Sequence, residues 1–425
     1  MKLDCMDLSG NKLHGSLIVP PLSISYFYIS NNNFRGGIHP SFRKWNNLKF
    51  LDISYNHFGA SVPRWLCNFN SSLEVFDLHG NNFEGRLHGM FSFGSMHNLK
   101  LLDLNYNQFQ GQVPQSLINC SKLQIFNLGH NQISDVFPFW LQNLPELQVL
   151  VLRSNKFYGP IWHLNKSPGF LKLGFMELAF NYFNGSLPSE YFTNWGSMMV
   201  NDVDGKTTTF TYLKVMSSKY LVQCYRMEVI NKGVEMENDK ISIIFKSIDL
   251  SNNRFDGEIP SSIGNLQAVV VLNSSSNRFT GPIPSSIGNI REVESLDHSN
   301  NKLIGRIPQQ LTNLSFLAYL NLSQNQLTGQ IPQGKQFDTF SNSSFKENPR
   351  LCGSPLSKKC EPKAKETPIS YQRKVQIDFN WKEVVMGYGC GFVVGSVIGY
   401  VLIFRQGLAG LFWRSFIGRY IYERW

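Results

Sequence analysis

The stretch LKFLDISYNHFGASVP (residues 48–63) decides the fold, because its pattern returns along most of the chain. LKLLDLNYNQFQGQVP (99–114) and LAYLNLSQNQLTGQIP (317–332) align with it without a gap. The shared unit is L-x-x-L-x-L-x-x-N-x-L/F-x-G-x-I/V-P, and it recurs in steps of 21 to 26 residues outside one interruption. Its Asn occupies Asn11, Asn32, Asn56, Asn81, Asn107, Asn131, Asn155, Asn181, Asn253, Asn277, Asn301 and Asn325. A period of this length predicts a solenoid of stacked repeats.

Each part of the unit has a physical role. The L-x-L alternation predicts a short strand with one face toward the core, and the following Leu or Phe fills the same core after a turn. The Asn amide can donate to and accept from backbone groups of neighbouring coils. Gly permits the next turn, and Pro ends strand pairing before the convex side. Since one unit cannot bury its Leu row alone, we expect a leucine-rich repeat array, an α/β-type repeat solenoid with about twelve visible units.

Two units depart from this template. The strand Leu position holds Ser274 in LNSSSN and His298 in LDHSNN. A polar group in that row costs about 1–3 kcal/mol unless it has a hydrogen-bond partner. We expect His298 to be a buried, hydrogen-bonded imidazole rather than a ligand or metal site. A tolerated defect and relaxed selection on a partial copy both stay open as explanations.

The composition favours a protein outside the cell. Only 16% of residues are charged, and the formal charge of +10 comes from scattered Lys and Arg. This disfavours nucleic-acid binding and favours attraction to acidic wall polysaccharide or lipid headgroups. Cys352 and Cys360 flank the short loop CGSPLSKKC and predict a disulfide in an oxidising compartment. Cys67 and Cys120 lie in repeat units and are expected to be small buried apolar residues.

The period fails between Asn181 and Asn253 and then resumes. We call residues 189–244 the island. This segment contains β-branched and charged residues and lacks the repeat pattern. A gap of this kind predicts an inserted loop that folds back on the array. Residues 336–360 are expected to cover the apolar end of the last coil. The mixed charges of residues 361–383 predict a solvated linker.

Residues 384–404 form a run of 21 residues without a charge, and Arg405 ends it. This length can cross a hydrocarbon core of about 30 Å, so we predict one transmembrane helix. Glycines at four-residue intervals place a stripe on one face of that helix: Gly387, Gly391, Gly395 and Gly399. Such a stripe lets a second helix approach closely, although glycine is also common in membrane helices generally. The aromatic tail, 405–425, is expected on the cytoplasmic side, along an anionic leaflet.

Candidate N-glycosylation sites occur only on the N-terminal side of this run. They are Asn70, Asn119, Asn165, Asn184, Asn273, Asn313, Asn321 and Asn342. Together with the array and the cap, they favour an extracellular N-terminal part.

Several stretches resemble plant proteins. The G-x-I-P ending resembles the plant extracellular subclass of leucine-rich repeats, and NPRLCGSPLSKKC (348–360) is similar to the C-terminal cap of plant leucine-rich repeat receptors. INKGVEMENDKI (230–241) resembles the island of plant receptor-like proteins, and DFNWKEVVMGYGCGFVVGSVIGYV (378–401) resembles their juxtamembrane and membrane pattern. The order of segments is similar across nearly the whole chain.

This resemblance implies a single-pass plasma-membrane receptor of defence or development, without a kinase of its own. Family members pair with a membrane-anchored receptor kinase through the transmembrane helix and recruit a short co-receptor kinase, here expected at the island and C-terminal repeats. The expected division is 1–188 (eight repeats), 189–244 (island), 245–335 (four repeats), 336–360 (cap), 361–383 (linker), 384–404 (transmembrane helix) and 405–425 (tail). MKLDCMDLSG (1–10) contains no signal peptide, and the family's N-terminal cap is missing, so we expect an N-terminally truncated version of a longer protein.

Comparing the repeats locates an expected ligand face. The two solvent-facing residues before each Asn lie on the concave side, and after the island the first of them is always Ser. Before the island this pair includes aromatic, His and Arg residues, which anchor ligands at low entropic cost. The candidates are Tyr55, His79, Asn105, Tyr106, His130, Arg153 and Phe180. We expect this face to bind an extracellular peptide, protein or glycan; surface drift is the alternative.

Other functions are disfavoured. No G-x-S-x-G, H-E-x-x-H or similar constellation occurs, so we expect no catalytic residue, cofactor or metal, and no enzyme. A leucine-rich repeat inhibitor of wall-degrading enzymes would share the fold but lack the membrane span. A truncated, non-signalling decoy is the third possibility.

Overall fold

The computed structural model describes residues 3–17, 19–63, 72–87, 96–162, 170–200, 214–216, 222–224, 227–238, 242, 244–360, 391–398, 400 and 401. The chain divides into two compact units, Met1–Cys360 and Glu361–Trp425. This division does not test the finer boundaries between repeats, island, cap and linker, which stay predictions.

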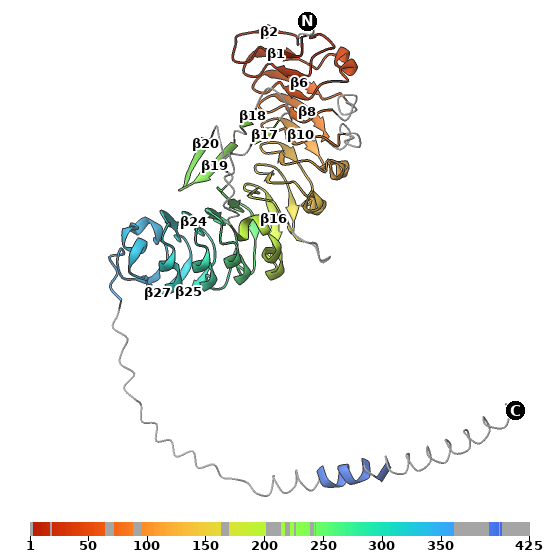
Figure 1. Cartoon of the computed structure of the whole chain (residues 1–425). Helices are drawn as coiled ribbons and strands as arrows, with labels where there is room; N and C mark the ends of the chain where they lie inside the picture. Colours follow the sequence, from red (N-terminus) through yellow and green to blue (C-terminus); the bar gives the residue numbers. More distant parts are fainter. Residues whose placement is uncertain are drawn as a thin grey trace, which may run out of the picture. The chain divides into compact units, whose positions relative to one another are not determined.

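The main sheet of the first unit has twelve parallel strands, about one from each coil (Figure 1). They are β1 (Cys5–Asp7), β3 (Tyr26–Tyr28), β5 (Phe50–Asp52), β7 (Val75–Asp77), β9 (Leu101–Asp103), β11 (Ile125–Asn127), β13 (Val149–Val151), β15 (Phe175–Glu177), β21 (Ser247–Asp249), β23 (Val271–Asn273), β24 (Ser295–Asp297) and β26 (Tyr319–Asn321). Successive coils pair in chain order, and β15 pairs directly with β21 across the island. The predicted strand of each L-x-L segment and the solenoid fold are therefore confirmed.

Shorter strands and 3-10 helices complete the coils. The further parallel strands are β2 (His14–Gly15), β4 (Asn33–Gly36), β6 (His57–Ser61), β8 (Asn82–Arg86), β10 (Gln108–Gly111), β12 (Gln132–Ile133), β14 (Tyr158–Gly159), β16 (Tyr182–Gly185), β22 (Arg254–Phe255), β25 (Ile304–Gly305) and β27 (Gln326–Gln330). The helical turns are η1 (Pro40–Lys44), η4 (Gln115–Asn119), η5 (Phe139–Asn143), η6 (Ser189–Asn194), α2 (Gly196–Met199), η7 (Ser261–Asn265), η8 (Ser285–Asn289) and η9 (Gln309–Asn313). Several of these turns begin directly after the repeat proline, which cannot continue strand pairing.

The core is a set of side-chain rows that run from coil to coil. Leu51 and Leu102 point into it from the main sheet and are fully buried. Phe58, Phe83 and Phe109 add a second row after the turn, with ring centroids 6.2 and 6.4 Å apart. Burying one such side chain contributes about 1.5–3 kcal/mol, and each coil depends on its neighbours for that burial.

The repeat Asn forms the predicted ladder between coils. The Asn56 Nδ2 donates to the Ile29 carbonyl of the preceding coil at 2.9 Å, and its Oδ1 accepts from the Phe34 N–H at 3.1 Å. The same two-sided bonding is made by Asn32, Asn81, Asn107, Asn131, Asn155, Asn181, Asn253, Asn277, Asn301 and Asn325. Asn348 extends the ladder one coil beyond the last predicted repeat, because it bonds to the Leu322 carbonyl and the Leu327 N–H.

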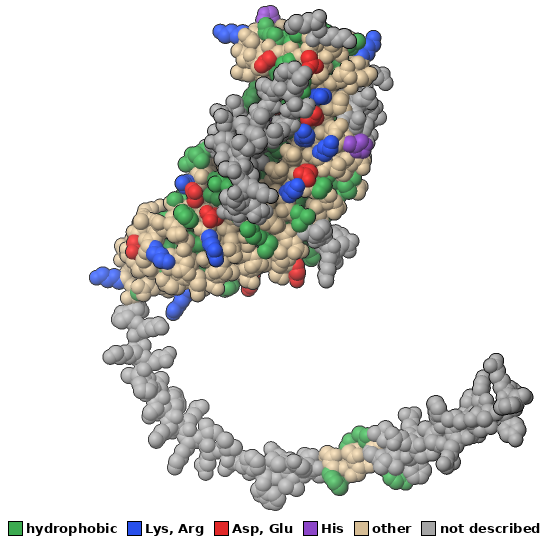
Figure 2. Space-filling view, viewed as in Figure 1, with side chains coloured by type: hydrophobic (Ala, Val, Ile, Leu, Met, Phe, Trp, Pro, Cys, Tyr) green, Lys and Arg blue, Asp and Glu red, His purple; other side chains and the backbone are tan. Residues whose placement is uncertain are grey.

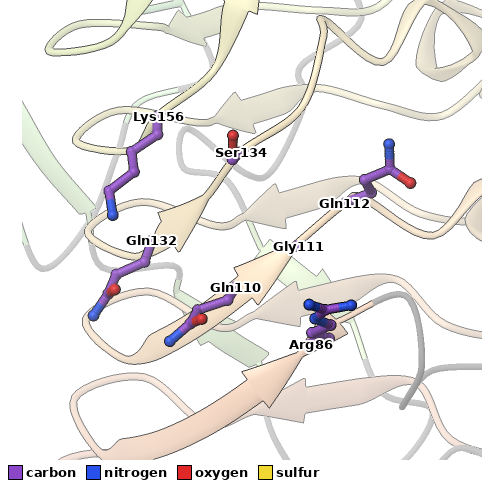
Figure 3. Close-up of a pocket in the computed structure, with 7 residues that line it drawn as sticks. All are labelled: Arg86, Gln110, Gly111, Gln112, Gln132, Ser134 and Lys156. Atoms are coloured by element: carbon purple, nitrogen blue, oxygen red, sulfur yellow. The ribbon is translucent and has the colours of Figure 1, made fainter.

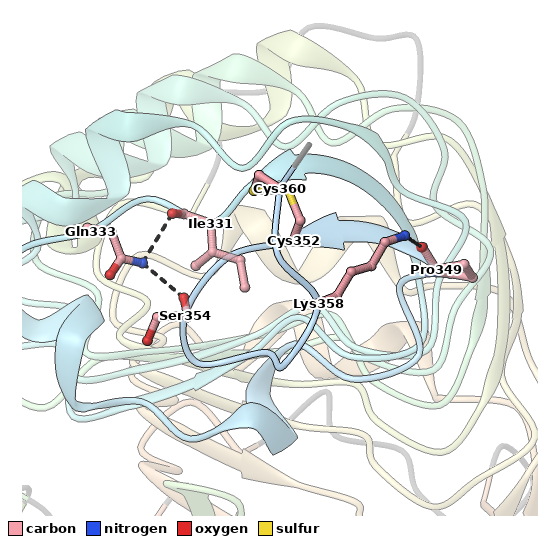
Figure 4. The surroundings of a disulfide bond; sticks show 7 residues. All are labelled: Ile331, Gln333, Pro349, Cys352, Ser354, Lys358 and Cys360. Atoms are coloured by element: carbon pink, nitrogen blue, oxygen red, sulfur yellow. Dashed lines mark hydrogen bonds between the residues drawn. A yellow bond between two sulfur atoms is a disulfide. The ribbon is translucent and has the colours of Figure 1, made fainter. Parts of the chain in front are cut away.

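The C-terminal end of the array is closed by η10 (Lys335–Thr339), η11 (Asn342–Ser344) and β28 (Arg350–Cys352), which pairs with β27. Cys352 and Cys360, the pair that the sequence predicts, form a disulfide with their Cα atoms 4.9 Å apart (Figure 4). The Lys358 Nζ donates to the Pro349 carbonyl at 2.7 Å and braces the same loop. The Cys120 thiol is buried as predicted, and burial raises its pKa to about 12; Cys67 lies outside the described residues.

The two polar replacements in the strand Leu row lie side by side. His298 is 0% exposed, and its Nδ1 lies 2.5 Å from the Ser274 Oγ, so the two side chains are hydrogen-bonded. Burial lowers the pKa of His298 to about 4, which keeps the ring neutral near pH 7. The expected buried, hydrogen-bonded imidazole is observed, and its partner is the other exception to the template.

In the second unit, residues 391–398, 400 and 401 are described and are helical. Gly391 and Gly395 belong to this helix, whereas Gly387 and Gly399 lie outside the described residues. Among the helices that the structure describes, none combines the length and apolar character needed to cross a membrane. The span 384–404 and its glycine stripe therefore stay predictions, as do the linker and the tail.

Candidate functional site

The residue directly before the ladder Asn has a left-handed backbone in many coils. Its φ is 47° at Tyr55, 48° at Tyr106 and 55° at Phe180. After the island the same position holds Asn252, Ser276, Asn300 and Gln324, with φ between 51° and 56°. Left-handed backbone suits Gly and Asn and is unfavourable for bulky side chains. The backbone therefore does not favour the aromatic residues found at this position before the island.

Four of the candidate side chains form a continuous line of rings, which we call the ring row. Tyr55 and His79 have ring centroids 4.6 Å apart, His79 and Tyr106 are 5.6 Å apart, and Tyr106 and His130 stack at 4.0 Å. In the two coils that follow, the guanidinium of Arg153 lies 5.9 Å from the centre of the Phe180 ring. Tyr55, Tyr106 and Phe180 are 40%, 38% and 47% exposed, so this line presents aromatic surface to solvent.

Two of the predicted solvent-facing residues are instead buried. Asn105 is 6% exposed and Arg153 is 4% exposed. The Asn105 Oδ1 accepts from the Tyr106 N–H at 2.9 Å, and Arg153 lies over the Phe180 ring. The prediction that Asn105 and Arg153 face solvent is therefore wrong: both are buried beside an aromatic neighbour, and their contact with a ligand stays a prediction. Alternation along the chain could not reveal this, because burial depends on what packs above the sheet.

A row of carboxyl groups accompanies the ring row, and sequence reasoning missed it. Asp52, Asp77 and Asp103 lie opposite one another in three neighbouring strands. Burial raises the pKa of Asp52, although the hydrogen bonds that Ser54 donates to this carboxylate act to lower it. Burial and the two flanking carboxylates raise the pKa of Asp77 well above its usual range. The signal was available as the recurring Asp in LDI, FDL and LDL.

The island contributes a β-hairpin to this surface. β19 (Met227–Asn231) and β20 (Val234–Asn238) are antiparallel and turn at Lys232 and Gly233, both with positive φ. Glu228 accepts a 2.8 Å hydrogen bond from the Tyr106 Oη and lies 3.8 Å from the His130 Nε2. Val229 is buried in one apolar cluster with Val149, Val151 and Phe175 of the main sheet. This hairpin, a described part of the island, packs on the array, and Glu228 is a site residue that the sequence did not identify.

The tip of the hairpin reaches the coils after the island. The Lys232 N–H donates to the Ser295 Oγ at 3.2 Å, and the Lys232 Nζ lies 3.2 Å from a Glu294 carboxylate oxygen. Gly233 packs against Tyr319 so closely that an added Cβ would lie 2.8 Å from the Tyr319 Oη. The hairpin therefore contacts coils on both sides of the island. A second short hairpin pairs β17 (Lys214–Met216) with β18 (Val222–Cys224).

The electrostatics favour a neutral imidazole at His130. Burial, followed by the nearby Arg153 and His79, lowers the pKa of His130 to about 4. A neutral imidazole can both accept and donate a hydrogen bond, and the tyrosine hydroxyls can do the same. Charged side chains of both signs are interspersed over the face shown in Figure 2. This arrangement suits stacking and hydrogen bonding with a ligand.

The structure separates the candidate glycosylation sites. Asn119, Asn184, Asn313 and Asn342 are exposed, while Asn70 and Asn165 lie outside the described residues. Asn273 is buried, and its Nδ2 donates to Asp249 at 3.3 Å. Asn321 likewise donates to Asp297 at 3.2 Å on the main sheet. Those two amides are engaged in the fold, so the folded chain disfavours the prediction of a glycan at either.

Comparison with known proteins first defines the class. Leucine rich repeat models match residues 97–157 and, separately, 23–45, 47–69, 245–266 and 316–334. The chain is 42% identical over 402 residues to Receptor-like protein 35 of Arabidopsis thaliana, covering 93% of this chain and 41% of that protein. It is 46% identical over 409 residues to Receptor-like protein 53 of the same plant, covering 94% of this chain and 41% of that protein.

The ectodomain of the Arabidopsis receptor kinase HAESA, solved with an extended IDA peptide hormone, has the same fold. It superposes with a TM-score of 0.63 at 26% identity, over 84% of this chain and 51% of that chain. The chain is therefore homologous over most of its length to plant leucine-rich repeat receptor-like proteins. It spans about two fifths of the length of the two relatives named above.

Proposed function

We propose that this chain acts as a cell-surface receptor-like protein that binds an extracellular peptide on the concave face of the coils before the island. The observation that carries the proposal is the ring row together with the Phe180 ring that follows it two coils further on. Bulky aromatic side chains occupy left-handed backbone positions at Tyr55, Tyr106 and Phe180, where the later coils use Asn, Ser and Gln. The turn imposes this conformation on every coil, and a bulky aromatic residue there is less favourable than Asn, which supports a role for the aromatic side chains.

The comparisons support this proposal at the level of the family. The relatives are named receptor-like proteins. The HAESA ectodomain, which shares the fold, is bound to a peptide hormone. A stacked aromatic surface with hydroxyl and imidazole groups gives an extended peptide both apolar contact and hydrogen bonds. A peptide is therefore favoured over a glycan for this face.

Signalling is proposed to depend on partners. The island hairpin bonds to Tyr106 before the island and to Ser295 after it. A ligand that stacks on the ring row would also contact or displace the hairpin, and the coils after the island would sense the change. We place a co-receptor kinase at those coils and the hairpin. A receptor kinase would dock on the glycine stripe of the predicted span, because small residues let a second helix approach closely.

The test is peptide capture from plant apoplastic fluid on the immobilised full chain, read by mass spectrometry. The variant is Tyr55→Asn/Tyr106→Asn/Phe180→Asn, since Asn tolerates left-handed backbone and preserves the fold. The matched control is Ser276→Asn/Gln324→Asn at the same repeat position after the island. We expect the triple variant to capture at least tenfold less peptide than the unchanged chain, and the control to capture as much as the unchanged chain. Equal capture by all three proteins would refute the assignment.

A further inference from the structure

A second binding surface lies on a different sheet from the ring row. β8, β10 and β12 pair in parallel beside one another, apart from the main sheet. A hollow of about 580 Å³ on these coils, which we call the lateral groove, is lined by Arg86, Gln110, Gly111, Gln112, Gln132, Ser134 and Lys156. None of these residues belongs to the ring row or to the island hairpin, so the groove needs its own explanation.

The long side chains of the lateral groove come from four successive coils. Gln110 pairs in register with Arg86 on one side and with Gln132 on the other. Lys156 follows on the next coil, where its backbone N–H donates to the Ile133 carbonyl at 2.8 Å. All four side chains are exposed. Since neighbouring strands lie about 4.8 Å apart, the backbones of Arg86 and Lys156 lie on coils roughly 14 Å apart, with the two glutamines on the coils between them.

Glycine shapes the floor of the lateral groove. Gly111 has φ +82°, and a Cβ added there would lie 3.4 Å from the Arg86 Cβ. The missing side chain leaves room for Arg86 to extend along the sheet. Figure 3 shows Gln110, Gln132 and Lys156 extending to one side from successive coils, with the Arg86 guanidinium next to Gly111. The hollow is therefore lined by long side chains whose ends are polar, while their aliphatic stems form most of its exposed surface.

The charge of the lateral groove is positive. Among the described residues that line it, none is acidic. Two carboxyl groups occur beside lining residues in the sequence: Glu84, which pairs in register with Gln108, and Asp135, which follows Ser134. The Asp135 carboxylate accepts from the Val113 and Val136 N–H groups at 3.0 and 2.8 Å, so it is engaged by the backbone. An anionic ligand meets two cations here, at the ends of a row of neutral amides.

This pattern matches a linear polymer that carries one carboxylate and several hydroxyls on each ring. Amide side chains both donate to and accept from hydroxyls, and Arg and Lys bind carboxylates with charge-assisted bonds. A sugar ring in an extended chain advances by about one strand spacing, so consecutive rings can face consecutive coils. A small anion would not reach both cations, and a lipid surface would be met by a broad basic patch rather than by separated cations.

We propose that the lateral groove binds an acidic polysaccharide of the uronic-acid type, with Arg86 and Lys156 holding carboxylates and Gln110 and Gln132 holding hydroxyls. The formal charge of +10 assists the approach of such a polymer over a longer range. This site is independent of the peptide face. It would tether the receptor to an acidic polysaccharide matrix while the ring row stays available.

The experiment measures binding of de-esterified polygalacturonate oligomers to the full chain in mild detergent, at low ionic strength and with EDTA to prevent calcium gelation. Arg86→Gln/Lys156→Gln is expected to weaken binding about tenfold and to reduce its salt dependence, because two charge-assisted contacts are lost. Gln110→Ala/Gln132→Ala is expected to weaken binding severalfold without changing the salt dependence. Thermal unfolding checks that each variant is folded.

The matched control is Lys302→Gln/Arg306→Gln. Lys302 follows its ladder Asn as Lys156 does, and Arg306 occupies the position of Arg86 in its repeat, so the charge loss is equal. We expect this control to bind like the unchanged chain. The fully methyl-esterified polymer should bind at least tenfold more weakly. The proposal is overturned if the control weakens binding as much as Arg86→Gln/Lys156→Gln does, if esterification has no effect, or if phosphatidylserine vesicles compete as well as the polymer.

Discussion

Replacing the buried pair Ser274 and His298 by leucine tests how the array tolerates polar residues in its core. The two side chains are hydrogen-bonded to each other between Leu250 and Leu322, which continue the same row. A single substitution leaves the other polar group buried without its partner, which costs about 1–3 kcal/mol. The double substitution removes both groups and restores the leucine row, at a packing cost because leucine is larger than serine.

We therefore expect the free energy of unfolding to be unchanged or lower in each single variant, His298→Leu and Ser274→Leu. The double variant should be more stable than the sum of the two single changes in that free energy predicts. The coupling free energy should be about 1–3 kcal/mol. It is measured by urea unfolding of the full chain, with hydrogen exchange at the amides of β23 and β24 reporting the local stability. Additive effects would contradict the pairing seen in the structure.

The same pair predicts a dependence on pH. The pKa of His298 is about 4 in the folded chain and about 6.5 in the unfolded chain, so below pH 6.5 the unfolded state binds protons that the folded state excludes. Stability is then complete above pH 6.5 and falls as the pH is lowered toward 4. Between pH 7 and pH 5 the loss from this residue is about 2 kcal/mol. The double variant should lack that part of the acid sensitivity; an unchanged slope would refute the reasoning.

Three further predictions concern the ladder, the island and the predicted span. Asn155→Leu leaves a carbonyl and an N–H of the preceding coil unpaired, so the free energy of unfolding should fall by about 2–5 kcal/mol in thermal or urea unfolding, whereas an exposed Asn300→Ser change should alter it little. Glu228→Gln weakens the contact of the hairpin with Tyr106 and His130, so limited proteolysis within the island should become faster; unchanged protection would show that Val229 alone holds the hairpin. Gly391→Leu/Gly395→Leu should abolish co-precipitation with a receptor kinase while carbonate-resistant membrane association is kept, and retention of the kinase would exclude the glycine stripe as its docking site.

Much of the fold could be predicted because each coil contacts only its neighbours. The spacing of Asn56 from the Leu and Phe positions around it is repeated in every unit, so a local pattern predicts the strand, the core row and the ladder together. The cap was predicted from its cysteine loop, but Asn348 was not recognised as a ladder residue. It follows FKE rather than an L-x-L segment, and only the bonding to Leu322 and Leu327 reveals its role.

The candidate site could be predicted only in part. The position of each residue within its repeat correctly predicted exposed aromatic rings at Tyr55, Tyr106 and Phe180, because all three directly precede the ladder Asn. It wrongly indicated open positions at Asn105 and Arg153, whose burial depends on neighbouring coils and on whatever packs over the sheet.

The sequence by itself determined the period, the parallel stacking of the coils and the membership of the repeat class, because these follow from contacts between residues that recur at fixed spacing. Only the tertiary structure decided that Glu228 meets Tyr106 and that cations from separate coils share one groove. Such contacts join side chains from different coils or from an insertion without a period. Nothing in local spacing specifies them until the chain has stacked.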